Sequence, residues 1–70
     1  MPGLVGFATC LRAMRTAHGW TQAELARRVG MVQPNIARFE AGQRLPSWAT
    51  VQRFAEALGV STEAFRDRDE

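Results

Sequence analysis

The 70-residue sequence has few of the side chains from which catalytic and metal sites are built. It contains one cysteine, Cys10, and one histidine, His18, so an internal disulfide is excluded and no Cys/His set has metal-ligand spacing. No Ser/His/Asp arrangement, paired-carboxylate site or glycine-rich phosphate loop is present. We therefore expect no enzyme activity, no catalytic residue, no metal and no cofactor.

Long apolar runs are missing as well. No stretch approaches the roughly 20 apolar residues that span a bilayer. Residues 1–6 do not join a basic segment to a long apolar run, as an export signal would. The lone Cys10 suits a reducing compartment. We expect a cytoplasmic protein that binds no membrane.

Lysine is absent, so all nine cationic side chains are arginines, and the net charge is only +2. Residues 1–60 hold seven arginines and three glutamates, a local charge of +4, whereas residues 61–70 carry a local charge of −2. A basic body with an acidic end suits a polyanionic partner. A solvated surface in an arginine-favouring genome explains the same composition, so charge alone does not decide the function.

The chain length allows one small domain, spanning residues 1–70, and is too short for a catalytic cleft with a full supporting core. Such a domain is marginally stable unless it is well packed or paired with a second subunit. We therefore expect a dimer.

The apolar residues recur with helical spacing, and nothing alternates with the period of two typical of strands. The sequence predicts an all-α fold without repeats or linkers. Helices are expected over about residues 7–18, from the Thr21 cap to residue 29, over residues 33–41, from the Ser47 cap to residue 58, and as a short fifth segment around residues 64–65 after the Ser61 cap. Residues 67–70 are expected to be a frayed end.

Two of these helices form a tight unit over residues 22–41. Gly30 can adopt a left-handed conformation that ends the earlier helix and swings the chain toward the next. Ala26 is small enough to let the two helix backbones approach each other. Thr21 and Glu24 have the spacing of a capping box, in which each side chain binds the other residue's amide.

The outer face of the helix over residues 33–41 carries little bulk. If Ile36 and Phe39 face inward, small side chains and a few polar ones face outward, and such a helix fits deep into a groove. Gln33 has the geometry to pair with adenine and Arg38 with guanine in the major groove of DNA. A solvent-exposed helix would show the same polar residues, and the helix alone favours neither interpretation. The other outward positions are Pro34, Ala37 and Ala41.

Residues 11–15, 19–26 and 33–42 read LRAMR, GWTQAELA and QPNIARFEAG. With Pro46-Ser47 and residues 57–60, they make the chain resemble the phage-repressor-like (XRE/Cro-type) helix-turn-helix family over about residues 7–65. The resemblance implies a compact five-helix lambda-repressor-like domain that binds double-stranded DNA. Its third helix would lie in the major groove and the start of its second helix against a phosphate.

The resemblance also implies roles for individual residues. Gln33, Pro34 and Arg38 would face bases. Gln22 would bind a phosphate and brace Gln33, and Asn35 would lie near the backbone or a base edge. Further phosphate or flanking contacts are implied for Thr21, Gln43 and Arg44.

Arg15 and Glu40 match the positions at which the family joins the first and third helices by a partly buried ion pair. Such a pair would hold the reading helix at a fixed angle. If both side chains were instead exposed, their attraction would contribute little.

The chain departs from the family at two places. Val32 stands where Ser or Thr usually caps the third helix, and Ala41 stands where Asn usually follows the glutamate. We expect the first amides of that helix to be left for water or a DNA phosphate.

These observations predict a sequence-specific transcriptional regulator, a repressor or controller protein, that binds an inverted repeat as a homodimer. The alternative is a protein-interaction module or antitoxin that uses the same fold to bind a protein partner such as a toxin. Phage, restriction-modification and toxin-antitoxin settings are not separated by the sequence. The candidates for the dimer contact are Leu45, Trp48, Val60 and Phe65.

Overall fold

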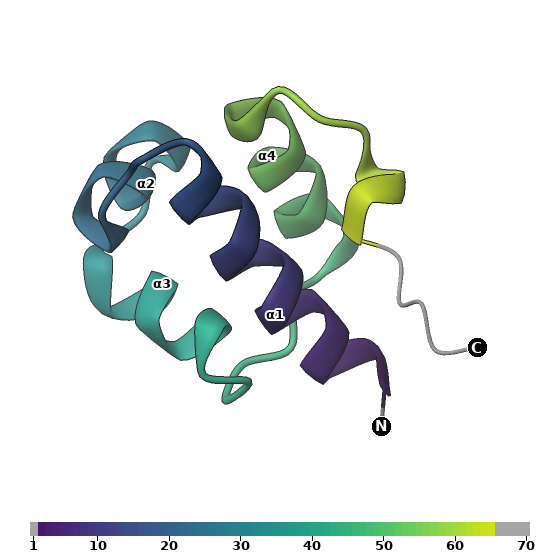
Figure 1. The fold of residues 1–70 in the computed structure, drawn as a ribbon. Helices are drawn as coiled ribbons and strands as arrows, with labels where there is room; N and C mark the ends of the chain where they lie inside the picture. Colours follow the sequence, from purple (N-terminus) through teal and green to yellow (C-terminus); the bar gives the residue numbers. More distant parts are fainter. Residues whose placement is uncertain (1, 66–70) are drawn as a thin grey trace.

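The computed structural model describes the backbone of residues 2–65 and the side chains of residues 6–65. This part of the chain forms helices and no strand, as expected for the all-α class (Figure 1). None of its helices is long and apolar enough to cross a membrane. In chain order the elements are α1 (Pro2–Ala17), α2 (Gln22–Val29), α3 (Gln33–Glu40), α4 (Trp48–Leu58) and the 3-10 turn η1 (Thr62–Phe65).

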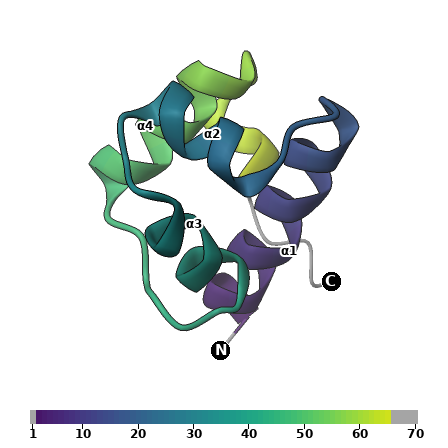
Figure 2. The same ribbon diagram turned by 90° about the vertical axis from the view of Figure 1, so that its left-hand side faces the viewer.

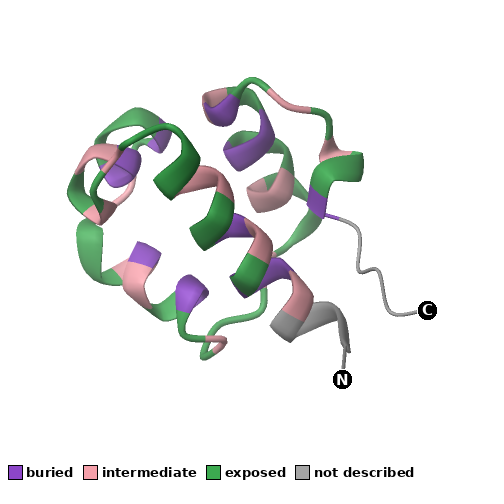
Figure 3. Cartoon of the chain, in the orientation of Figure 1, coloured by how far each residue is buried: buried purple, intermediate pink, exposed green. Residues whose placement is uncertain are grey.

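One hydrophobic core receives side chains from all five elements, and the buried segments of the helices turn toward each other (Figure 3). Leu11, Leu25 and Ile36 are fully buried in it. They come from α1, α2 and α3, which explains how three short helices hold together without a disulfide. Burying each such side chain contributes about 1.5–3 kcal/mol. The rest of the cluster is Phe7, Ala26, Val29, Phe39, Phe54, Ala55, Leu58 and Phe65.

All four phenylalanines meet in this core. Phe7 on α1 lies at the centre, with its ring centroid 5.9 Å from that of Phe39, 5.8 Å from Phe54 and 5.1 Å from Phe65. Phe39 and Phe54 pack edge to face at 5.5 Å. Aromatic pairs favour such offset and edge-to-face arrangements. The phenylalanines therefore join α1, α3, α4 and η1 around one point.

The turn between α2 and α3 is built as the sequence predicts. Gly30 has φ +74°, in the left-handed region, and the Met31 N–H donates to the Ala26 carbonyl at 2.8 Å. This bond closes the end of α2. Ala26 is buried, with 2% of its surface exposed, so the small side chain is needed at this crossing.

α3 ends at Glu40, one residue earlier than expected. At its start, one of the first backbone N–H groups finds a hydrogen-bond partner within the chain. Val32 makes no side-chain cap bond, as predicted. However, the Asn35 N–H donates to the Val32 carbonyl at 3.0 Å, and Pro34 has no N–H. The expectation that the first amides of this helix lack partners within the chain is therefore wrong for Asn35.

The capping box at α2 is only half formed. The Thr21 hydroxyl accepts from the Glu24 N–H at 3.0 Å, as predicted. The Glu24 carboxylate does not reach back, because it pairs with Arg27 and Arg28 one turn later. Two arginines attract a carboxylate more strongly than one neutral amide.

Two further boundaries differ from the prediction. α1 begins at Pro2 and not near Phe7, since helix propensity is a weak guide and the glycines at positions 3 and 6 do not stop this helix. The expected fifth helix is a single 3-10 turn, η1, although Ser61 does cap it through the Glu63 N–H at 3.0 Å. The predicted frayed end at residues 67–70 lies outside the described residues.

Candidate nucleic-acid interface

α3 lies at the surface with its apolar side turned to the core and its polar side turned outward, on the near side of the molecule in Figure 2. Ile36 and Phe39 are buried, as the sequence predicts. Gln33, Pro34 and Arg38 are exposed, and so is Ala41, while Ala37 is half-buried. The outward face is therefore a slim strip on which only Gln33 and Arg38 project long polar side chains.

A chain of hydrogen bonds runs from this strip into the domain. Gln33 Nε2 donates to Gln22 Oε1 at 2.7 Å, and Gln22 Nε2 donates to Glu40 Oε1 at 3.1 Å. An amide that donates at one end and accepts at the other has its orientation fixed. Gln22 thus links the first residue of α3 to the last, and both glutamine side chains have a defined direction.

This series of hydrogen bonds ends at a buried ion pair between α1 and α3. Arg15 Nε lies 2.6 Å from Glu40 Oε2 and Arg15 Nη2 lies 3.0 Å from Glu40 Oε1, a two-pronged arrangement. The side chain of Glu40 is 3% exposed and that of Arg15 is 14% exposed. The third guanidinium nitrogen donates to the Trp20 carbonyl at 2.8 Å. The hydrogen bond with Glu40 outweighs desolvation and raises the pKa of Arg15 further above its ordinary value.

Asn35 brings two arginines together at the other side of α3. Its Oδ1 lies 3.4 Å from Arg38 Nη1 and 3.5 Å from Arg44 Nη1, at the outer limit of hydrogen bonding. Arg44 also lies over the Phe39 ring, with its guanidinium carbon 5.6 Å from the centroid. Gln43, just before it in the loop, is exposed. The loop after α3 therefore presents its cation beside the helix.

α2 begins at Gln22 and is capped by Thr21, which is exposed. At the other end of the helix, Arg27 and Arg28 pair with Glu24. The hydrogen bond from Arg27, with help from Arg28, holds the pKa of the Glu24 carboxyl below its ordinary value. These two arginines are thus partly neutralised by a carboxylate, whereas Arg38 and Arg44 lie near the neutral amide of Asn35, and Arg44 also lies over the Phe39 ring.

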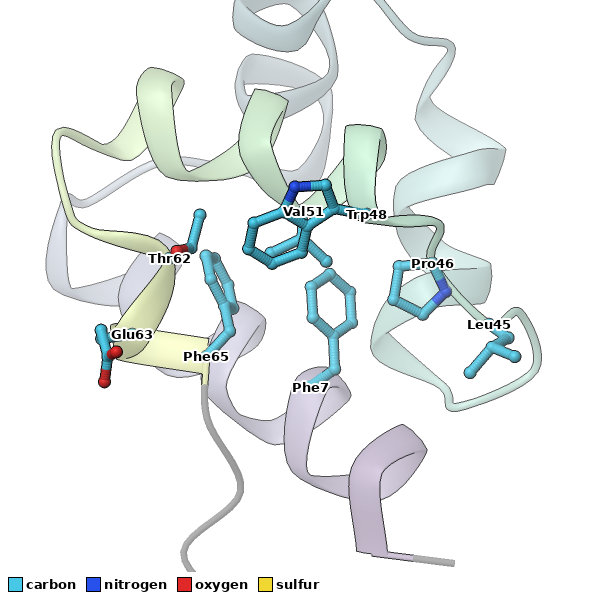
Figure 4. A pocket seen from close by; sticks show the side chains of 8 residues that line it. All are labelled: Phe7, Leu45, Pro46, Trp48, Val51, Thr62, Glu63 and Phe65. Carbon is cyan, nitrogen blue, oxygen red and sulfur yellow. The ribbon is translucent and has the colours of Figure 1, made fainter.

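A second surface feature is an apolar groove of about 390 Å³ between the loop before α4, α4 itself, α1 and η1 (Figure 4). Leu45 and Trp48 at its edge are 73% and 63% exposed. Of the other two dimer candidates, Val60 is half-buried against the core, and Phe65 is 7% exposed and belongs to the core. The groove is lined by Phe7, Leu45, Pro46, Trp48, Val51, Thr62, Glu63 and Phe65.

Arg53 has a role that the sequence does not indicate. From α4 its Nη2 donates to the Val29 carbonyl at 2.7 Å, where α2 ends. A Cβ on Gly30 would lie 3.3 Å from the same nitrogen. This bond joins residues 24 positions apart, so no local sequence signal could have revealed it.

Two short helices joined by a tight turn, the later one lying outward with a polar face, define a helix-turn-helix domain. The chain belongs to the phage-repressor-like (XRE/Cro-type) helix-turn-helix family, since the family model described as a helix-turn-helix domain matches residues 7–68.

Relatives with curated names include regulators and an antitoxin. An uncharacterised HTH-type transcriptional regulator of Methanothermobacter thermautotrophicus is 43% identical over 51 residues, which are 73% of this chain and 74% of that protein. Antitoxin HipB of Escherichia coli O6:H1 is 33% identical over 54 residues, 77% of this chain. That match spans only 57% of HipB, so the rest of HipB has no counterpart in the matched part of this chain.

Solved structures share the fold. The restriction-modification controller protein C.AhdI from Aeromonas hydrophila superposes with a TM-score of 0.86 at 33% identity, over 90% of this chain and 96% of C.AhdI. Hydroxypropylphosphonic acid epoxidase from S. wedmorenis matches with a TM-score of 0.83 at 28% identity, but over only 33% of its own chain. The fold therefore occurs both as nearly a whole protein and as a minor part of a larger one.

Proposed function

We propose that this chain is a sequence-specific, double-stranded DNA-binding transcriptional regulator that reads the major groove with α3 and acts as a homodimer. The observation that carries the proposal is the braced Gln33. Its amide is held by Gln22, which is held by Glu40 and, through it, by Arg15. A side chain that is oriented before binding loses less entropy when it pairs with a base.

The base contacts follow from the exposed strip of α3. Gln33 pairs with adenine N6 and N7, and Arg38 pairs with guanine O6 and N7. Pro34 faces the bases as well, and the small Ala37 and Ala41 leave room for the helix to enter the groove.

The flanking contacts come from the two ends of this strip. Gln22 and Thr21, at the N-terminus of α2, meet one phosphate, which the partial positive charge of the helix start favours. Asn35, Gln43 and Arg44 meet phosphates on the other side. Such contacts fix the position of the helix without reading sequence.

The homodimer uses the apolar groove. Trp48 and Leu45 expose a large apolar surface at its edge, and exposed apolar patches of this kind mark protein contacts. A two-fold pair places its reading helices one DNA turn apart, about 34 Å, so its operator is an inverted repeat. C.AhdI, a controller protein of nearly the same extent, supports a repressor or controller role.

The second candidate is a protein-binding module. The match to the antitoxin HipB favours it, and so does the same exposed groove, which a toxin could occupy in place of a second copy. DNA binding by α3 and protein binding by the groove involve different faces, so both can operate in one protein.

The test uses duplexes that the protein itself enriches from a random pool. Arg38→Ala should lower affinity for the enriched duplex by about 1–3 kcal/mol and relax the choice of one base pair. Arg44→Ala should weaken binding to all duplexes alike and reduce the slope of log affinity against log salt by about 1. Arg12→Ala, which removes an exposed arginine of α1, is the charge-matched control.

If Arg38→Ala and Arg44→Ala both bind DNA like the unchanged protein, α3 is not the reading helix. If no duplex is enriched and the protein instead binds a protein partner through the groove, its function is that of a protein-binding module.

A further inference from the structure

Val32 is an exposed valine whose backbone, and not its side chain, helps to close the start of α3. It is 62% exposed and sits at the N-cap of α3, where its side chain makes no cap hydrogen bond. Among residues 6–65, only Leu45 and Trp48 are other large apolar side chains exposed to this degree, and both line the apolar groove. Val32 does not line that groove, so dimer formation does not explain its exposure.

The backbone directs Val32 outward. Its φ of −92° and ψ of 151° are extended, and neighbouring side chains on extended backbone point to opposite sides. Met31 packs against the core, so Val32 points away from it. The next two residues, Gln33 and Pro34, are also exposed. Val32 therefore continues the exposed strip of α3 at its N-terminal end.

The side chain offers only apolar contact at a place where a polar one would be expected. The Asn35 N–H, which a Ser or Thr cap would bind, already donates to the Val32 carbonyl at 3.0 Å. Val32 is thus free to contact a ligand. The apolar group that base edges present in the major groove is the C5 methyl of thymine.

We propose that Val32 reads a 5-methylpyrimidine, through its C5 methyl group, beside the base that Gln33 contacts. This inference rests on the proposed function, since it requires α3 to lie in the major groove. It adds a specificity determinant that neither Gln33 nor Arg38 supplies, because their hydrogen bonds do not distinguish thymine from uracil.

The experiment uses the enriched duplex with each thymine replaced singly by uracil, which removes one methyl group and no hydrogen-bonding group. We expect one position in each half-site at which the replacement lowers affinity about fourfold, the effect of one buried methyl. Replacing that thymine by 5-methylcytosine, paired with guanine, should retain more affinity than replacing it by cytosine. In Val32→Ala, the thymine and uracil duplexes should bind alike.

Val32→Thr and Val32→Ser form a matched pair of variants. Both add the same hydroxyl at the N-cap, so a change in helix capping affects them equally. Only threonine keeps a methyl group, so Val32→Thr should retain the preference for thymine over uracil and Val32→Ser should lose it.

The inference is overturned if the enriched duplex binds equally well with uracil at every thymine position, or if Val32→Ala keeps the full preference. Either result would leave binding to the enriched duplex, and therefore the proposed function, intact. Failure to enrich any duplex would remove the basis of both.

Discussion

Glu40 shows how one residue can connect stability with the proposed function. Its carboxylate accepts hydrogen bonds from Arg15 and from Gln22, and the latter also holds Gln33. The sequence resemblance implied the Arg15 partnership and the contact between Gln22 and Gln33. The bond from Gln22 to Glu40, which joins them into one network, became visible only in the structure.

Replacing Glu40 by Gln should destabilise the domain by about 3 kcal/mol, because the guanidinium of Arg15 would remain buried without its counter-charge. Urea unfolding monitored by circular dichroism measures this change. Glu24→Gln is the control: Glu24 pairs with arginines at the surface, so its loss should alter stability little. Equal effects of the two substitutions would contradict the importance of burial at Glu40.

The elements show which local signals are reliable. Thr21, Ser47 and Ser61 cap the segments that they were predicted to cap, because these bonds form between near neighbours in sequence. In contrast, α1 begins at Pro2 and not near residue 7, and the predicted fifth helix is the 3-10 turn η1. The length of a helix end depends on what packs beside it as much as on its own residues.

The α2–α3 turn gives a prediction at this scale. Gly30→Ala should cost about 1–2 kcal/mol from its φ of +74°, and more because its Cβ would lie 3.3 Å from Arg53 Nη2. Gly59→Ala is the matched control, since Gly59 has φ +72° and open space around the position of a Cβ. In thermal unfolding, the midpoint temperature of Gly30→Ala should be lower than that of Gly59→Ala. If the two are equally stable, the Arg53 contact is irrelevant.

The whole molecule has two distinct surfaces, the polar strip of α3 and the apolar groove beside α4 and η1. Of the four residues expected at a dimer contact, Leu45 and Trp48 are exposed, whereas Phe65 is a core residue whose ring meets that of Phe7. The sequence could not show that Phe65 is packed in the core while it also lines the groove, because core and surface apolar residues share the same helical spacing.

Trp48→Glu should shift the proposed dimer toward monomer, because it places a charge in the apolar contact. Sedimentation velocity over a range of protein concentrations measures the equilibrium between monomer and dimer. Ala13→Glu, with the same change of charge at an exposed position on α1, should leave it unchanged. A Trp48→Glu variant that dimerises like the unchanged protein would exclude Trp48 from the interface.

The sequence by itself determined the helical class, the tight α2–α3 turn and the residues that line the outer strip of α3. These follow from spacing, capping and glycine conformation, which act over a few residues. The tertiary structure alone decided that Gln33, Gln22, Glu40 and Arg15 form one connected network, that Phe65 is internal and that Arg53 closes the end of α2. Each of these depends on segments far apart in the chain, and their meeting is governed by the packing of the whole core.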